Sequence, residues 1–216
     1  HLDGLSMYPT TLGAPALRNS IAIWLGRRFK GVEINPETEV IPVNGSREAL
    51  FSFAQAMIDS SVRDPVVVCP NPFYQIYEGA ALLAGASPHF INTFPDNQFK
   101  LDYAQLPDSV WARVQLMYVC SPNNPTGSVM TLSDWQELFA LSDRHGFIVA
   151  SDECYSEIYS DEDNPPLGAL DAAHQLGRTG FPRLVVFNSL SKRSNAPGLR
   201  SGFVAGDARL LEKFLL

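Results

Sequence analysis

The sequence predicts an α/β domain in which helices cover both faces of a mostly parallel sheet. Several short runs consist almost entirely of Val, Ile and other apolar residues, which is typical of strands buried on both faces. Segments with apolar residues at helical spacing separate many of these runs, as expected for parallel strands joined by crossover helices. The 216 residues, of which 45% are hydrophobic, suffice for one to two domains with a real core.

The first half of the chain opens with a clear helical pattern. Leu17, Ile21 and Leu25 recur at helical spacing, and the pattern stops near Gly31, since glycine favours helix ends. The elements predicted for this half are a helix over 14–30, a strand over 40–43, a helix over 46–59, a strand over 66–69, a helix over 73–84, an extended segment over 88–92 and a short helical segment over 102–106.

The second half repeats the alternation. Its predicted elements are a strand over 114–120, an amphipathic helix over 132–144 that stops at Gly146, and strands over 147–150, 184–188 and 201–205. The segment from Asp161 to Pro166 is acidic and contains proline, so it is predicted to be a surface loop.

Composition excludes several classes of function. The formal net charge of −7 argues against binding to a phosphate backbone, so no nucleic-acid partner is expected. No apolar run approaches the roughly 20 residues of a membrane span, so no membrane partner is expected either. The cysteines lack metal-ligand or disulfide spacing and are expected to be buried thiols of a cytoplasmic protein: Cys69, Cys120 and Cys154. The histidines are isolated, so we assign them no role and expect no metal: His1, His89, His145 and His174.

Polar, turn-rich clusters follow five of the predicted strands. They cover residues 44–47, 70–74, 121–127, 151–155 and 189–192. In parallel sheets the chemistry gathers beyond the carboxyl ends of the strands, where such clusters meet. Five of them exceed what a purely structural domain needs, so we expect a functional site at that edge.

The first cluster, Gly45-Ser46-Arg47, lies between a strand and the start of a helix. Helix N-termini offer free N–H groups and a positive dipole end, so a phosphate could bind there. The alternative is that Ser46 only caps the helix. The pattern is neither a Walker motif nor the dinucleotide fingerprint.

Asp152 directly follows the buried run that ends at Ser151. A carboxylate at such a position needs a cation or hydrogen-bond donors, or it loses its charge. A protonated ring nitrogen of a cofactor would be a good partner. The alternative is an N-cap of the next segment.

Lys192 and Arg200 lie in the last cluster and in the Ser- and Gly-rich segment after it. A lysine at the mouth of a sheet can be desolvated and become a nucleophile for carbonyl groups, although most lysines are solvated surface charges. The Arg200 guanidinium could bind a phosphate, and its alternative is a salt bridge across two loops.

Two further clusters have equally plain alternatives. The stretch from Asn123 to Gly127 has the composition of a tight turn. Tyr74 and Tyr155 could be residues at the edge of the core.

In combination these motifs resemble those of the class I/II aminotransferases, which are fold-type I enzymes dependent on pyridoxal 5′-phosphate (PLP). The resemblance runs from about Tyr8 to Asp207 and is carried by SPNNPTG at 121–127, by Asp152-x-x-Tyr155, and by Ser189-x-x-Lys192 followed by Arg200. It implies the three-layer α/β/α large domain of that fold, with a mostly parallel central sheet.

The resemblance also implies a role for each motif residue. Lys192 would be the lysine that carries PLP, and Asp152 would keep the pyridine nitrogen protonated, so that Lys192, Asp152 and Tyr155 form the catalytic group. Asn124 and Tyr155 would bind the phenolic oxygen of the ring. Tyr74 would stack on the ring, where many relatives have Trp or Phe. The residues implied to hold the phosphate are Gly45, Ser46, Arg47, Ser189 and Arg200.

Tyr8 fits the family as the tyrosine that reaches the phosphate of a neighbouring subunit, which implies a homodimer; the alternative is that Tyr8 packs locally. The stretch 189–207 and the Met7–Thr11 segment look like the succinyldiaminopimelate transaminase group of bacterial lysine biosynthesis. That group implies glutamate as donor and N-succinyl-2-amino-6-oxopimelate as acceptor. Aspartate, alanine and aromatic aminotransferases share the core motifs, and PLP β-lyases share the frame. A transcription regulator with an aminotransferase-like effector domain is a further alternative.

With this resemblance, the length of the chain predicts which part of the enzyme it covers. The start at His1 rather than Met, and the motif order, predict a fragment: residues 1–207 as a PLP-binding large domain with an incomplete N-terminus, and 208–216 as the start of the connection to a missing C-terminal small domain. Because the family takes its substrate-carboxylate arginine from that small domain, the isolated piece is expected to be a poor catalyst.

Overall fold

Seven strands form a single sheet in the computed structural model, which describes residues 7–216; the start at His1 lies outside the described residues. The spatial order is β1-β7-β6-β5-β4-β2-β3. The strands are β1 (Val40–Val43), β2 (Val66–Asn71), β3 (Ser87–Asn92), β4 (Val114–Cys120), β5 (Ile148–Asp152), β6 (Leu184–Ser189) and β7 (Gly202–Gly206).

Most neighbouring strands run parallel. The parallel pairs are β2–β3, β2–β4, β4–β5 and β5–β6, whereas β7 is antiparallel to both β6 and β1. Strand β1 therefore points the same way as β6, and the carboxyl ends of β1, β2, β4, β5 and β6 share one edge. The predicted α/β class with a mostly parallel sheet is confirmed.

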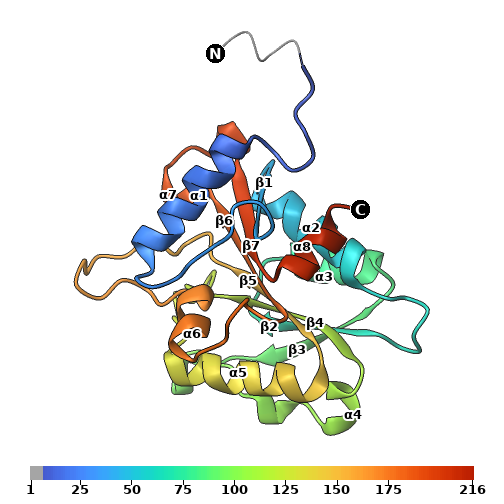
Figure 1. The fold of residues 1–216 in the computed structure, drawn as a ribbon. Helices are drawn as coiled ribbons and strands as arrows, with labels where there is room; N and C mark the ends of the chain where they lie inside the picture. The colour runs from blue at the N-terminus through green and yellow to red at the C-terminus, as the bar shows by residue number, and fades with distance from the viewer. Residues whose placement is uncertain (1–6) are drawn as a thin grey trace.

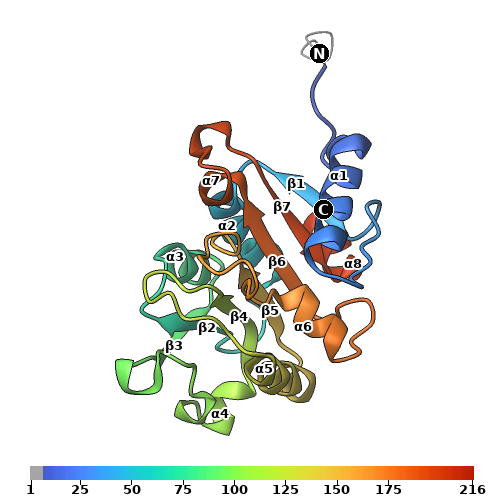
Figure 2. The same cartoon turned by 90° about the vertical axis from the view of Figure 1, so that its left-hand side faces the viewer.

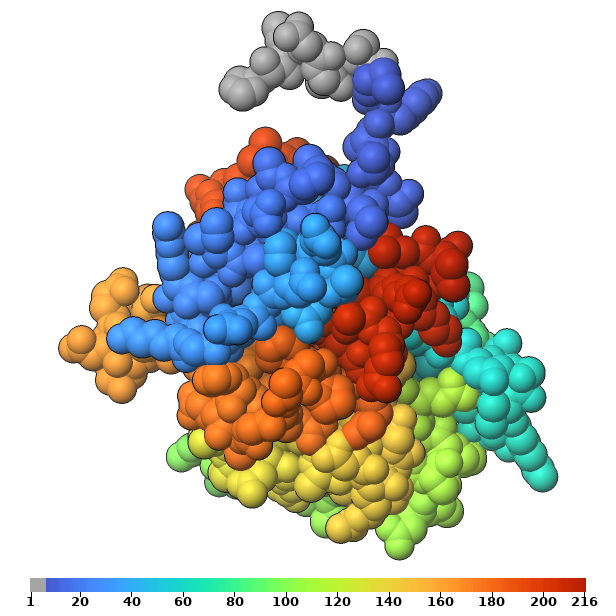
Figure 3. Space-filling view, viewed as in Figure 1, coloured from blue at the N-terminus to red at the C-terminus, as the bar shows by residue number. Residues whose placement is uncertain are grey.

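Helices cover both faces of the sheet (Figures 1 and 2). One face carries α1 (Pro15–Arg28), α4 (Asp108–Trp111), α5 (Leu132–His145) and α6 (Ala169–Gln175). The other face carries α2 (Ser46–Met57), α3 (Ile76–Leu83) and α8 (Ala208–Phe214). In the space-filling view α1, α6 and α5 lie side by side across one side of the molecule (Figure 3). The predicted three-layer arrangement is thus observed.

The core divides into two layers because strand side chains alternate between the faces. In β6, Val186 packs with the α1, α5 and α6 side, while Val185 and Phe187 pack with the α2 and α3 side. All three are essentially inaccessible to solvent, as expected for strands that read as unbroken apolar runs.

Sequence periodicity located the long elements well and missed the short helices. Strands 40–43 and 114–120 agree with β1 and β4 at both ends, and the helix predicted to stop at Gly146 ends there in a left-handed residue. Helices α4, α6, α7 (Leu190–Arg193) and α8 were not predicted. Helix α6 illustrates why: its three alanines and its leucine are buried and its polar residues face outward, but with seven residues it spans only about two turns, too few to establish a helical period.

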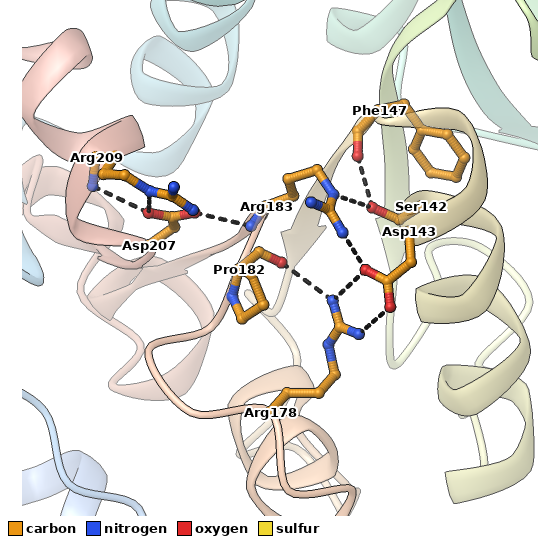
Figure 4. A network of polar contacts seen from close by, with 8 residues as sticks. All are labelled: Ser142, Asp143, Phe147, Arg178, Pro182, Arg183, Asp207 and Arg209. Atoms are coloured by element: carbon orange, nitrogen blue, oxygen red, sulfur yellow. Dashed lines mark hydrogen bonds and ion pairs between the residues drawn. The ribbon is translucent and has the colours of Figure 1, made fainter.

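A polar network joins α5 to the amino end of β6 (Figure 4). Arg178 donates two hydrogen bonds to Asp143, at 2.6 and 2.9 Å, and Arg183 contacts the same carboxylate. Arg183 also donates from Nε to Ser142 Oγ at 3.2 Å and from its backbone N–H to Asp207 Oδ2 at 2.8 Å. This network lies at the amino edge of the sheet, opposite the edge where the strand-end clusters meet.

None of the described helices has the length and apolar character needed to cross a membrane. Within residues 7–216, no group of three or more His, Cys, Asp or Glu side chains is placed to hold a metal ion.

Candidate active site

A cavity of about 470 Å³ opens at the carboxyl edge of the sheet. Its walls come from the segments that follow β1, β2, β4, β5 and β6. The predicted site residues that line it are Ser46, Arg47, Tyr74, Asn124, Asp152, Tyr155, Lys192 and Arg200. Small-molecule sites are usually cavities of roughly 300–1,000 Å³. The clusters that the sequence placed at five strand ends therefore converge on one cavity of suitable size.

The first turn of α2 forms one end of the cavity. Gly45 is the N-cap of this helix and has φ +110°, a conformation that favours glycine. A Cβ on residue 45 would collide with the guanidinium of Arg200. Ser46 therefore does not cap the helix, and its Oγ lies 2.9 Å from Cys154 Sγ instead. The free N–H groups at the start of this 12-residue helix suit an anion.

Two arginines stand at the same end. Arg200 Nη2 donates to Glu48 Oε2 at 2.7 Å, so the salt bridge weighed as an alternative does form. The two side chains are 46% and 57% exposed, so the pair contributes little stability and an anionic ligand can replace Glu48. The guanidinium carbon of Arg47 lies 6.0 Å from the centroid of the Tyr74 ring.

Asp152 lies at the end of β5 and is 4% exposed. Its Oδ2 accepts a hydrogen bond from the Tyr77 hydroxyl at 2.7 Å, and its Oδ1 accepts one from the Cys154 backbone N–H at 3.2 Å. Among residues 7–216 it takes part in no ion pair. Burial raises the pKa of this carboxyl, against the opposing effect of its hydrogen bonds from Cys154 and Tyr77. A cation bound beside it would restore its negative charge.

The tyrosines of the cavity are hydrogen-bond donors at neutral pH. Burial raises the pKa of Tyr74 and of Tyr155, and the Asp152 carboxylate raises both further. Asn124 lies half-buried in the turn after β4. Together Tyr155 and Asn124 supply an O–H and an amide N–H to the wall of the cavity.

Lys192 belongs to the short helix α7, and its side chain is exposed at the cavity. Ser189 begins this helix: its Oγ accepts a hydrogen bond from the Ser191 N–H at 3.1 Å and donates to Ser191 Oγ at 2.9 Å. Ser189 is buried and lines a neighbouring pocket, while Ser191 lines the cavity. The predicted phosphate contact of Ser189 stays a prediction.

The segment before α1 leaves the body of the domain as an extended arm (Figures 1 and 3). Tyr8 belongs to this segment and is fully exposed. It takes no part in the cavity. The alternative of local packing for Tyr8 is therefore not observed, and its predicted contact with a second subunit stays a prediction.

Sequence reasoning missed several residues of the site. Tyr77, Glu48 and Cys154 were assigned no role, yet each contacts a predicted site residue. Cys69 and Cys120 are buried as predicted, whereas Cys154 is half-buried at the cavity. The spacing of Tyr77, three residues after Tyr74 at the start of α3, is the one sequence signal that could have drawn attention to it.

Glu153 is a second buried carboxyl that was not singled out. Its Oε1 accepts hydrogen bonds from the Ala169 N–H at 2.7 Å and the Ser151 hydroxyl at 3.2 Å. Burial raises the pKa of Glu153 to about 7. These contacts tie the start of α6 to the end of β5, next to Asp152.

Comparison with known proteins adds three findings. The sequence model of the family "Aminotransferase class I and II" matches residues 2–215. An LL-diaminopimelate aminotransferase of Desulforudis audaxviator is 34% identical over 206 residues, which are 95% of this chain and 50% of that protein. The chain thus spans about half the length of the curated relatives it matches.

Solved structures agree with this match. An aminotransferase from Neisseria meningitidis superposes with a TM-score of 0.95 and 55% identity, over 99% of this chain and 54% of that one. The N-succinyldiaminopimelate aminotransferase of Mycobacterium tuberculosis superposes with a TM-score of 0.85 and 28% identity, over 99% of this chain and 53% of that one.

Proposed function

Because the chain belongs to the class I and II aminotransferase family, whose cofactor is PLP, we propose that its cavity binds PLP for transamination between an amino acid and an oxo acid. The single observation that carries the proposal is that one cavity holds both a buried carboxyl that suits a cation and a helix start that suits an anion. Asp152 is a buried carboxyl without an ion-pair partner among residues 7–216, and the arginine-flanked start of α2 suits an anion.

The residues present fit PLP on physical grounds. The cofactor is a dianionic phosphate joined to a ring whose nitrogen can carry a proton. The phosphate matches the first turn of α2 with Ser46 and Arg200, where the lack of a Cβ at Gly45 lets the Arg200 guanidinium approach the start of the helix. The protonated nitrogen matches Asp152, and the aldehyde matches the amine of Lys192, which lines the same cavity.

PLP, when bound, supplies an electron sink that labilises bonds at the α-carbon of an amino acid. The protein residues then have separate tasks. Arg200, Ser46 and the α2 N–H groups would hold the phosphate, and Tyr74 would pack against the ring. The Asp152 carboxylate would accept a hydrogen bond from the ring nitrogen, while Tyr155 and Asn124 would donate to the phenolic oxygen. The Lys192 amine would hold the cofactor through its aldehyde and would serve as the base for the proton of the substrate α-carbon.

For the substrate we propose glutamate as donor and N-succinyl-2-amino-6-oxopimelate as acceptor. The Mycobacterium tuberculosis structure named for N-succinyldiaminopimelate supports this choice. A second candidate is LL-diaminopimelate, because several matching relatives are named for it at 33–36% identity. Both are diamino diacids or their derivatives, so the proposal places the enzyme in diaminopimelate and lysine synthesis.

The fully exposed Tyr8 supports a homodimer in which this side chain reaches the phosphate of the second subunit. Three free cysteines favour the reducing cytoplasm as the site of action.

Absorption spectroscopy of the purified chain with PLP tests the proposal. We expect a visible band that persists after dialysis, shifts on addition of glutamate, and becomes fixed to Lys192 by borohydride. Peptide mass analysis locates the fixed group, and Lys192→Ala is the control that must lose it. For the full-length protein, formation of 2-oxoglutarate from glutamate with each acceptor distinguishes the two substrates. A chain that shows no band, or a band unaffected by Lys192→Ala, would contradict the proposal.

A further inference from the structure

Tyr77 donates a side-chain hydrogen bond to the Asp152 carboxyl. Its hydroxyl donates to Oδ2 at 2.7 Å, and the ring is completely buried. Because burial raises the pKa of Tyr77 well above its usual value, this hydroxyl keeps its proton and acts as a donor. The other oxygen, Oδ1, is bound by the Cys154 backbone N–H. Both carboxyl oxygens are therefore oriented by the protein.

The Tyr77 ring is itself held in place. It stacks on Tyr118, with ring centroids 4.7 Å apart and an interplanar angle of 12°. Tyr118 in turn donates from its hydroxyl to the backbone carbonyl of Leu50 at 2.7 Å. Leu50 belongs to α2, the helix whose first turn forms the anion end of the cavity. A continuous chain of contacts thus links α2 to Asp152.

A second connection closes this chain into a ring. Cys154, whose N–H binds Asp152, lies with its Sγ 2.9 Å from Ser46 Oγ in the first turn of α2. Tyr74 lies against Tyr77 edge to face, with ring centroids 6.0 Å apart. Contacts through Tyr77 therefore connect the end of the cavity that contains Asp152 to the end formed by the first turn of α2. They fix the separation of these two ends.

We propose that Tyr77 is a positioning residue for the cofactor, which holds Asp152 in the orientation and ionised state that the protonated ring nitrogen of PLP requires. The inference rests on the proposed function, because it assigns Asp152 to the ring nitrogen. A hydrogen bond from a phenol stabilises the carboxylate form of Asp152. Without it, a buried carboxyl would compete for the proton of the ring nitrogen instead of accepting a bond from it.

Two variants separate this role from simple packing. Tyr77→Phe keeps the ring and its stacking on Tyr118 but removes the donor. Tyr103→Phe is the matched control: Tyr103 is also buried, and its hydroxyl has no hydrogen-bond partner in the described part of the chain. Thermal unfolding of both variants checks that they fold.

The measurement is the dissociation constant of two ligands from the 216-residue chain carrying Lys192→Ala, so that binding is non-covalent. One ligand is PLP, and the other is its 1-deaza analogue, in which carbon replaces the ring nitrogen. We expect Tyr77→Phe to weaken PLP binding by about tenfold or more, as for loss of a hydrogen bond to a charged group, and to change binding of the analogue by less than about threefold. Tyr103→Phe is expected to change neither.

Nitrogen-15 NMR of labelled PLP at saturation gives an independent reading. The chain with Tyr77 is expected to show a protonated ring nitrogen, and Tyr77→Phe a shift toward the unprotonated form. Should Tyr77→Phe fail to fold, Tyr77→His, which retains a donor, is compared with Tyr77→Leu, which does not. Only the histidine variant is expected to favour PLP over its analogue.

The outcomes distinguish the inference from the proposed function. If the chain with Tyr77 does not bind PLP at all, the proposed function fails. If it binds PLP and Asp152→Asn weakens that binding, but Tyr77→Phe behaves as Tyr103→Phe does, the inference alone is overturned. Equal weakening of both ligands by Tyr77→Phe would likewise overturn it, because that result assigns Tyr77 a packing role only.

Discussion

Replacing Gly45 by alanine is the sharpest test of the anion end of the cavity. Residue 45 has φ +110° and ψ 146°, a combination that is essentially restricted to glycine. Holding a residue with a Cβ there costs about 1–3 kcal/mol. The added Cβ would also meet the Arg200 guanidinium and the Glu48 carboxylate. These are the ends of flexible, exposed side chains, so they can move away, and the stability cost comes mainly from the backbone.

Arg200 cannot move without consequence for a ligand, because its guanidinium lines the cavity. We therefore expect Gly45→Ala to lower the melting temperature by at least roughly 2 °C, the shift that about 1 kcal/mol produces in a chain of this size. We also expect it to weaken PLP binding by at least about tenfold, since displacement of Arg200 removes a charge-assisted contact to phosphate.

Gly79→Ala is the matched control. Gly79 lies within α3, and a Cβ there would contact no other atom within 4 Å. The same substitution is expected to stabilise the chain by about 0.5–1 kcal/mol, because alanine is the better helix former, and to leave PLP binding unchanged. Melting curves and dissociation constants are measured for both variants side by side. A Gly45→Ala chain that melts no lower than the unchanged chain and binds PLP equally well would refute both the strain and the assignment of the phosphate to α2.

Three further predictions concern other parts of the molecule. Because the folded pKa of Glu153 is raised to about 7, the folded state binds the extra proton and its stability falls as the pH rises from about 4.5 to about 7. Urea unfolding across this range should show the slope, and Glu153→Gln should reduce it, leaving the contribution of Asp152, whose pKa is also raised. Hydrogen bonding by Arg178 lowers the pKa of Asp143, so Asp143→Asn should lower the free energy of unfolding near pH 7. The loss should be about 1 kcal/mol or less because solvent screens the partly exposed carboxylate, and it should shrink as the pH falls through the folded pKa. Tyr103→Phe should leave the urea midpoint unchanged or raise it, since its hydroxyl is buried without a partner among the described residues; a clear drop would contradict this.

The sequence predicted the location of the site better than its contacts. Strand runs and the polar residues after them are local features, and the rule that parallel strands end at one edge turns them into a spatial prediction. That rule brought Ser46, Asn124 and Asp152 together although they are far apart in the chain. The resemblance then supplied their expected roles.

The contacts that orient these residues could not be derived in this way. The bonds from Tyr77 to Asp152 and from Arg200 to Glu48 join residues 75 and 152 positions apart, and each depends on the exact facing of two elements. A tyrosine such as Tyr77 satisfies a helical apolar pattern whether or not its hydroxyl has a partner. Its hydrogen bond is therefore invisible to periodicity and becomes evident only when α3 is placed against β5.

The two edges of the sheet have different roles: one contains ion pairs that join elements of the fold, and the other contains the residues of the cavity. At the amino edge, Asp143 is held by two arginines that join α5 to the start of β6, and none of these residues lines the cavity. At the carboxyl edge, Asp152 is buried without an ion pair among residues 7–216, and Arg200 forms its ion pair with an exposed glutamate. Burial of an unpaired carboxyl lowers the stability of the folded chain, and a bound cation would offset this cost. The carboxyl edge is therefore arranged for a ligand, whereas the ion pairs of the amino edge stabilise the fold. It follows that substitutions around Asp143 should change unfolding without changing PLP affinity, whereas Asp152→Asn should weaken PLP binding and leave the ligand-free chain as stable or more stable.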